Sequence, residues 1–266
     1  MKFKRRWTQV SLRTVFVLLS VFCVWFGWHA NRANRQRRAV ERIVALGGTV
    51  GYDYQLTVGP HGDYVYDPKT EPDQPAWLRA LFGPHFFDRA ITVTLNKTAV
   101  TDDDLAVLHD LPDIELLSLS HTRIGDAGMA HVGNLPGIEA LTLCHTQIGD
   151  AGMAHVGQLR ELRALSLWNV PVGDEGIRHL SQCPKLENLV LDGTRITDAG
   201  LAHLANLTEL EEWLGLVDTA ITDSGVAQLS RLKKLKILNL RRTGVTADGY
   251  KRLLQLLPET SVSIGP

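Results

Sequence analysis

The sequence predicts an α/β solenoid that follows a transmembrane helix. From residue 87 to residue 258, one pattern of apolar, threonine and aspartate residues recurs about every 24 residues. Periods of this length are typical of solenoids, in which one small unit stacks on the next. Upstream, residues 14–30 contain no Lys, Arg, Asp or Glu, which is typical of a membrane-spanning helix.

The charge is divided unevenly along the chain. Residues 1–42 hold ten Lys and Arg against one Glu, whereas the rest holds 18 Lys and Arg against 28 Asp and Glu. The acidic body predicts that nucleic acid is not a partner, because binding phosphates requires clustered cations. The three cysteines, Cys23, Cys144 and Cys183, form no C-x-x-C pair, which indicates neither a disulfide scaffold nor a thiolate zinc site.

The N-terminal anchor consists of a basic tail at residues 1–13 and the apolar segment 14–30. As a helix this segment would be about 25 Å long, at the short end of what crosses a bilayer core. Cleavage after Ala30 would place Trp28 where a signal peptidase needs a small residue, so we expect an uncleaved, single-pass anchor. Five cations lie on each side of the span. The free amino terminus adds one charge to the first side, which favours an extracytoplasmic repeat domain.

Residues 31–86 are expected to cap the first repeat, because a stacked array exposes apolar surface at its end. We expect a linker helix over residues 31–46 and a short helix over residues 77–82. Between them, four tyrosines around residues 59–62 predict two strands and a turn: Tyr52, Tyr54, Tyr64 and Tyr66. A small tyrosine-lined binding module is the alternative. The whole core is expected downstream of residue 42.

Seven copies of the pattern L-x-x-L-x-L-x-x-T-x-I-x-D-x-G-L-x-x-L-x-x-L are predicted. The L-x-L pair predicts a short strand, and the D-x-G-L-x-x-L segment predicts one or two helical turns. The aspartates are expected to cap their own helices: Asp102, Asp126, Asp150, Asp174, Asp198 and Asp223. The threonines are expected to donate to turn carbonyls: Thr98, Thr122, Thr146, Thr194, Thr219 and Thr243, with Val170 in the fourth copy.

At these residues the chain resembles the leucine-rich-repeat family, and within it the threonine-bearing 24-residue repeats of bacterial membrane-anchored proteins. It is also distantly similar to the cysteine-containing repeats of F-box receptors. The resemblance implies a horseshoe of seven repeats, with a parallel β-sheet on the concave face and short helices on the convex face. Members of the family share this surface geometry but bind unrelated things, so the resemblance implies the fold and not the partner. Residues 259–266 are expected to cap the far end. Asp104 replaces the usual Gly, and one extra residue lies near Trp213.

Four histidines recur at one position of the helical segments: His131, His155, His179 and His203. Each precedes an inward Leu or Val, which indicates a half-exposed filler position. Ligands spaced along a line do not converge on one metal ion. We therefore predict neither a metal nor another cofactor.

The candidate partner-binding residues follow the strands on the concave face: His121, Cys144, His145, Trp168, Asp192 and Arg241. Exposed Trp and Arg dominate many protein interfaces. The alternative for Trp168 is that it merely packs over Val170 and Pro171. A neighbouring column of small residues leaves the wall open to another surface: Thr94, Ser118, Thr142, Ser166, Val190, Gly215 and Asn239.

The sequence therefore predicts a membrane-anchored, non-catalytic scaffold that binds a protein partner on its concave face. Catalytic residues are not predicted, because a Cys/His nucleophile also needs an orienting group and an oxyanion hole. Three alternatives remain. They are a structural component of an envelope assembly, a substrate receptor of a ubiquitin-ligase-like complex, and a metal or thiol enzyme at His121, Cys144 and His145.

Overall fold

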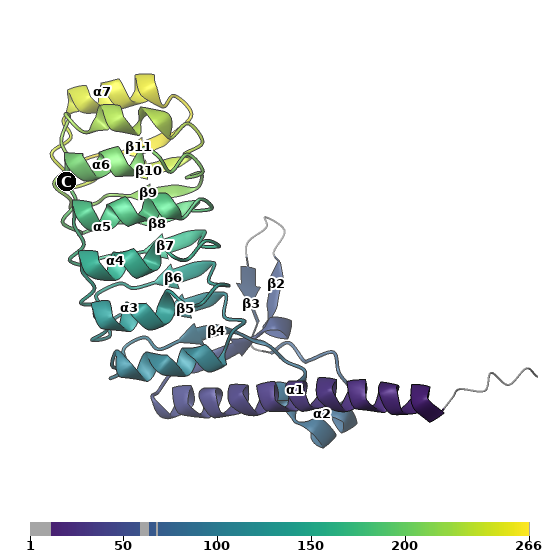
Figure 1. Cartoon of the computed structure of the whole chain (residues 1–266). Helices are drawn as coiled ribbons and strands as arrows, with labels where there is room; N and C mark the ends of the chain where they lie inside the picture. The colour runs from purple at the N-terminus through teal and green to yellow at the C-terminus, as the bar shows by residue number, and fades with distance from the viewer. Residues whose placement is uncertain (1–11, 59–63, 68, 266) are drawn as a thin grey trace, which may run out of the picture.

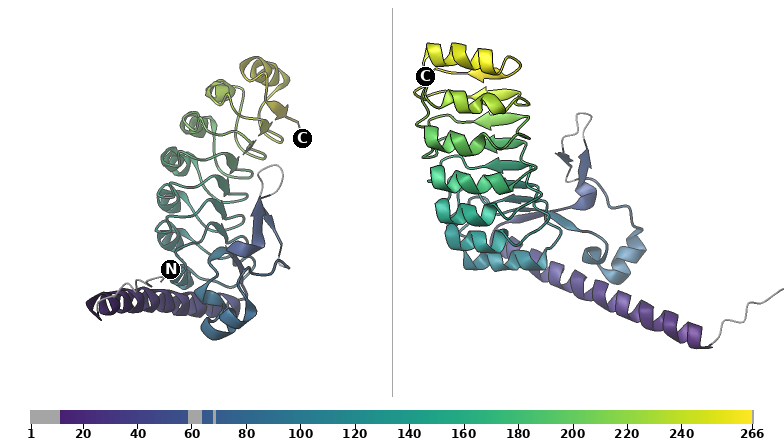
Figure 2. Two further views of the ribbon diagram at one scale, coloured as in Figure 1. Left: turned by 90° about the vertical axis from the view of Figure 1, so that its right-hand side faces the viewer. Right: turned by 45° about the horizontal axis from the view of Figure 1, so that its top comes forward.

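The main body is a curved stack with short strands on the inner side and short helices on the outer side (Figures 1 and 2). The computed structural model describes residues 12–58, 64–67 and 69–265. Within these residues the inner side is a nine-stranded sheet in the order β1-β4-β5-β6-β7-β8-β9-β10-β11. The observed architecture is an α/β solenoid.

The sheet changes direction only at its N-terminal end. There, β1 (Thr49–Tyr52) pairs antiparallel with β4 (Ala90–Thr94), and every later pair is parallel. The later strands are β5 (Leu116–Ser118), β6 (Ala140–Thr142), β7 (Ala164–Ser166), β8 (Asn188–Val190), β9 (Trp213–Gly215), β10 (Ile237–Asn239) and β11 (Ser261–Ser263). The outer helices are η3 (Asp103–Asp110), α3 (Asp126–Val132), α4 (Asp150–Val156), α5 (Asp174–Arg178), η4 (His179–Gln182), α6 (Asp198–Leu204), η5 (Val226–Arg231) and α7 (Ala247–Leu256).

Equivalent leucines of successive strands meet in register. Leu117 pairs with Leu141, which pairs with Leu165, and each of the three is at most 2% exposed. The apolar positions of strands and helices join into one continuous core, whose burial is the main stabilising term for a fold of this kind. The extra residue near Trp213 leaves the pairing of Leu189 with Leu214 intact.

The threonine that follows each strand donates its hydroxyl to the carbonyl three residues earlier. Thr146 Oγ1 lies 2.7 Å from the Leu143 oxygen. The same bond is made by Thr98, Thr122, Thr194, Thr219 and Thr243. The predicted role of this column is confirmed, and Val170 fills the position with an apolar side chain that is 1% exposed.

The aspartates do not cap their own helices, contrary to expectation. In α3 to α6 the Asp is the first helical residue, after a Gly or Thr. Its carboxylate accepts backbone N–H groups at the start of the next repeat's helical segment, where the donors lack intrahelical partners. Asp126 Oδ1 accepts from Gly149 at 2.7 Å and from Gly152 at 2.9 Å. Equivalent bonds join Asp102 to Gly125, Asp150 to Gly173, Asp174 to Thr197, Asp198 to Thr222 and Asp223 to Thr246.

The inter-repeat bond explains why Asp104 can replace a glycine. A Cβ on Gly152 would lie 2.6 Å from Asp126 Oδ1, which is too close for a real contact. Asp104 stands at the equivalent position of the first repeat, where no earlier repeat supplies an aspartate. Its carboxylate instead accepts the Thr101 amide at 3.1 Å and pairs with Arg42 at 3.2 Å.

The N-terminal helix α1 (Leu12–Ala45) is one continuous helix. Its second half lies across the first repeat, where Ala39 and Ile43 are 1% and 0% exposed and belong to the core. The expectation that the core lies wholly downstream of residue 42 was therefore wrong. Arg32 also pairs with Asp113. Towards its other end, α1 is long and apolar enough to cross a membrane. The 18-residue stretch with this property contains no buried residue.

The segment between α1 and β4 holds more strands than expected. It contains β1, η1 (Asp53–Gln55), β2 (Leu56–Val58), β3 (Tyr64–Tyr66), α2 (Ala76–Phe82) and η2 (Pro84–Phe86). The antiparallel pair β2–β3 forms a separate sheet, and Figure 2 shows it on the side of the strands rather than that of the outer helices. The predicted short helix agrees with α2. The predicted turn at residues 59–62 and most of the basic tail lie outside the described residues.

Candidate protein-binding surface

Three of the candidate side chains form one row at the carboxyl ends of the strands. The rings of His121 and His145 stack with centroids 4.3 Å apart, and the Trp168 ring meets His145 edge to face at 4.7 Å. The repeat brings them together because each follows its strand by two or three residues. Trp168 remains 47% exposed, so the row presents a large amphipathic ring to solvent.

The turn geometry fixes where the two imidazoles lie. His121 and His145 have φ of 57° and 55°, in the left-handed region that few side chains adopt. The same position is left-handed in Lys97, Asn169, Gly193, Asp218 and Arg242. Because the backbone conformation recurs, the side chains at this position lie in one line along successive repeats. This arrangement stacks the His121 and His145 rings.

Cys144 and Asp192 make bonds within the sheet instead of joining the ring row. The Cys144 sulfur lies 3.1 Å from Ser166 Oγ, and Asp192 Oδ1 accepts the Val217 amide at 2.8 Å. Burial is the main cause that raises the pKa of Asp192, against the opposing effects of the Val217 hydrogen bond and the Arg242 charge. Within the described part of the chain, no hydrogen bond joins the Cys144 thiol to either imidazole.

Arg241 lies near the far end of the sheet, just after β10, and its side chain is exposed. Two strands, β8 and β9, lie between β7 and β10 in the sheet order, so the structure does not bring Arg241 to the ring row. It is a separate candidate contact at the other end of the concave face.

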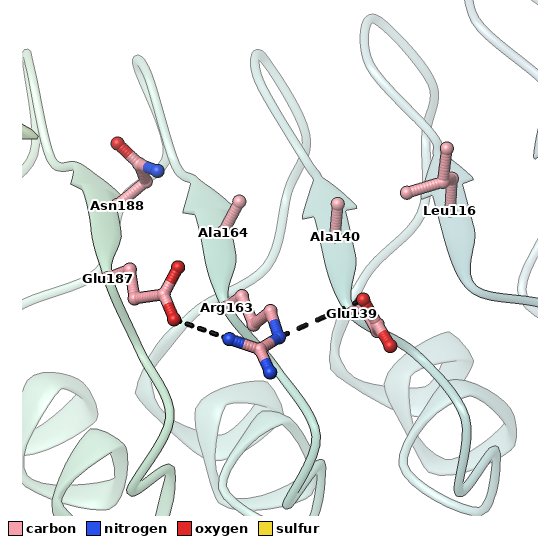
Figure 3. Close-up of a pocket in the computed structure, with 7 residues that line it drawn as sticks. All are labelled: Leu116, Glu139, Ala140, Arg163, Ala164, Glu187 and Asn188. Carbon is pink, nitrogen blue, oxygen red and sulfur yellow. Dashed lines mark hydrogen bonds and ion pairs between the residues drawn. The ribbon is translucent and has the colours of Figure 1, made fainter. Parts of the chain in front are cut away.

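A charged cavity lies at the opposite, amino ends of the strands, and the sequence analysis missed it. It has a volume of about 380 Å³. Figure 3 shows Arg163 between Glu139 and Glu187, with Ala140 and Ala164 above them. Arg163 pairs with Glu187 and lies 3.8 Å from Glu139. The signal was present in the sequence, because these residues precede the strands at 24-residue intervals.

Between the cavity and the ring row, the floor is made of small side chains. Ser118, Thr142, Ser166 and Val190 are half-buried, as are Ala140 and Ala164, which also line the cavity. Further along the face, Trp213 of β9 is half-buried, a second large aromatic that the sequence analysis did not assign to this surface. Small side chains leave the wall accessible, while larger groups stand at both ends of the strands. The surface thus has the shape of a shallow trough.

One carboxyl group on the acidic side of the trough has a raised pKa. Burial raises the pKa of Glu115, which precedes β5, and the nearby charge of Glu139 adds to the shift. The position directly before each strand from β5 to β10 holds four acidic residues, Glu115, Glu139, Glu187 and Glu212, and two basic residues, Arg163 and Lys236. The edge is therefore acidic overall.

The recurring histidines lie on the outer face and are half-buried, as predicted: His131, His155, His179 and His203. His131 and His109, which the sequence analysis did not group with them, have ring centroids 5.2 Å apart. Within the residues that the structure describes, no group of three or more His, Cys, Asp or Glu side chains is placed to share a metal ion.

Solved structures that are similar to this chain include two internalins from Listeria monocytogenes. Internalin C2 is 20% identical with a TM-score of 0.47, and the match covers 66% of this chain and 80% of that one. InlF is 17% identical with a TM-score of 0.40, and the match covers 63% of this chain and 58% of that one. No family model and no curated protein matches the chain. The solenoid architecture therefore rests on the strand pairing of this chain itself.

Proposed function

We propose that this chain is a membrane-anchored, non-catalytic module that binds another protein on its concave face. The observation that carries the proposal is the exposed Trp168 ring beside an open floor of small side chains. Large aromatic side chains, Trp in particular, are enriched among the residues that carry most of the binding energy in protein interfaces. The thiol enzyme is disfavoured because Cys144 bonds to Ser166 and the two imidazoles stack on each other.

The charges indicate what the partner presents to the trough. The edge formed by Glu115, Glu139 and Glu187 is acidic apart from Arg163. A partner with basic side chains facing this edge, and an apolar group facing Trp168, complements both ends of the strands. Complementary charges of this kind mainly set specificity and association rate.

The experiment uses the full-length chain in detergent, with its partner captured from membranes by cross-linking and then purified. Trp168→Ala is expected to weaken binding about thirtyfold, the loss expected for a strong interface anchor. Arg241→Ala tests the second site, and Arg178→Ala on the outer face is the matched control. If Trp168→Ala lowers the unfolding midpoint and leaves affinity unchanged, Trp168 is a packing residue and the docking site is elsewhere.

Membrane anchoring is supported by the apolar first half of α1, in which residues 12–28 are exposed apart from the half-buried Phe26. A transmembrane helix should retain the chain in the membrane fraction through alkaline extraction. We further propose that the repeats lie outside the cytoplasm. Protease added to sealed cells should then digest the repeats. Full protection of the repeats from the protease would place them in the cytoplasm.

A further inference from the structure

The short helix α2 presents an apolar face that no part of the described chain covers. Its residues Trp77 and Leu81 are 69% and 68% exposed. They are four positions apart, so they lie on the same side of the helix. On the other side, Phe82 packs against Phe86 and Phe87, with ring centroids at 5.2 and 6.1 Å.

Two contacts made by Asp88 link α2 to α1. Arg79 of α2 forms a two-pronged ion pair with Asp88, with distances of 2.6 and 2.7 Å. The Asp88 side chain is 2% exposed, and the Asp88 carbonyl accepts the Gln36 side chain of α1 at 2.7 Å. The exposed face of α2 is therefore presented in a fixed orientation relative to α1.

The place where α2 meets α1 is the end of the apolar segment. Phe26 of α1 lies 5.8 Å from Phe82 and 5.6 Å from Phe86, measured between ring centroids. Figure 1 shows α2 directly beside α1. On α1, Trp25 and Trp28 flank this contact and are 49% and 57% exposed. Amphipathic rings at the end of an apolar helix are typical of the boundary between headgroups and acyl chains.

The exposed face of α2 suits the same boundary chemically. Arg79 is the one ionisable residue among Ala76–Phe82. Its charge is neutralised by Asp88, and its side chain is only 18% exposed. Trp77, Ala80 and Leu81 thus offer an uncharged surface with one indole N–H, which can enter the boundary region without desolvating a free charge.

We propose that the exposed face of α2 lies in the headgroup boundary of the bilayer that α1 enters. The inference rests on the proposed membrane anchoring. The bilayer is the occupant because the Phe26–Phe82 contact makes the α2 face continuous with the apolar surface of α1. With two points of contact instead of one, the bilayer sets the tilt of the repeat domain and the direction in which its trough opens.

The test places an environment-sensitive fluorophore on single cysteines of the full-length chain in liposomes. Cys23 and Cys144 are replaced by serine. Cys183 is retained, because its burial raises the thiol pKa to about 11 and makes it unreactive. The probe positions are Leu81→Cys on α2, Leu18→Cys in the apolar segment and Ala151→Cys on the outer face as the aqueous reference. Lipids brominated near the headgroup end of the acyl chain serve as quenchers, and iodide is the aqueous quencher.

We expect bromolipid to lower the emission of the α2 probe about twofold, as for a side chain in the boundary region, and to leave the outer-face probe unchanged. The Leu18 probe should be quenched as well. If the Leu18 probe is quenched while the α2 probe responds only to iodide, the inference fails and the anchor stands. If neither the Leu18 probe nor the α2 probe responds to bromolipid, both the inference and the proposed membrane anchoring fail. An α2 probe shielded from both quenchers overturns the inference in favour of a protein that covers the face.

Discussion

The Asp126 carboxylate at the start of α3 accepts the backbone N–H of Gly152 in α4, at 2.9 Å. The two residues are one repeat apart, and the bond satisfies a donor in the first turn of the second helix. Bonds from a carboxylate to backbone N–H groups are among the stronger hydrogen bonds in proteins. Each repeat is thus joined to the next by a polar contact on the outer side, in addition to the shared apolar core and the sheet.

Gly152→Ala should destabilise the chain by up to about 2 kcal/mol. A Cβ would lie 2.6 Å from Asp126 Oδ1, and overpacking of this kind costs about 1–3 kcal/mol. The gain in helix propensity, about 1 kcal/mol, offsets only part of that cost. Urea unfolding of the detergent-solubilised chain, followed by tryptophan fluorescence, measures the change.

Gly149→Ala is the matched control for that substitution. At this position a Cβ would be 3.5 Å from the same carboxylate, which is ordinary contact, and the backbone has a negative φ of −109°. Its effect should stay within about 0.5 kcal/mol. Equal losses from the two substitutions would contradict the account of the inter-repeat bond.

Thr146→Val should cost about 1–3 kcal/mol, because it removes the hydroxyl that donates to the Leu143 carbonyl at 2.7 Å and nearly preserves the volume. Thr142→Val is the control, since that residue is half-buried on the open face and lies outside the threonine column. An unchanged denaturant midpoint for Thr146→Val would show that the threonine hydroxyls contribute no stability.

Arg79→Leu should destabilise the N-terminal region by about 3 kcal/mol or more, because it leaves the buried Asp88 carboxylate without its partner. Arg89→Leu removes a more exposed pair, with Asp53 at 3.1 Å, and should cost less than about 1 kcal/mol. Protection of α2 amides from hydrogen exchange locates the effect. Unchanged protection in Arg79→Leu would refute this role of the ion pair.

Asp192→Asn should change how stability depends on pH. Burial raises the pKa of Asp192 in the folded state, so folding favours its protonated form. Its contribution to stability is therefore highest below the unfolded pKa and is lost as the pH rises through the folded pKa. From about pH 3 to pH 7, the wild type should lose free energy of unfolding relative to Asp192→Asn. Parallel curves for the two proteins would contradict the prediction.

The strand and threonine positions could be predicted because the repeat period alone fixes them. An L-x-L pair that recurs every 24 residues has one arrangement that buries its leucines, and Thr146 must then lie at the turn. The same reasoning failed for Asp126. An aspartate at a helix start can reach its own first turn or the turn of the next repeat, and only the spacing between stacked repeats decides.

The surface was predicted only in part. His121, His145 and Trp168 follow the strands, where the sequence analysis looked for contacts. Arg163 precedes its strand and was missed, although its 24-residue spacing from Glu139 and Glu187 was visible. The core contribution of α1 was missed as well, because residues 31–46 were treated as a linker. The helical spacing of Arg32, Gln36, Ala39 and Ile43 on one face was the available signal.

Site-specific photo-cross-linking in cells that make the full-length chain tests most directly whether the concave face binds a protein. The cross-linkable residue replaces His121, the exposed residue at the end of the ring row away from Trp168, or Arg178 on the outer face as the control. We predict one discrete adduct from position 121, with a yield that falls about tenfold in the Trp168→Ala background, and none from position 178. An adduct from position 178 alone, or a yield at position 121 that Trp168→Ala leaves unchanged, would contradict the account.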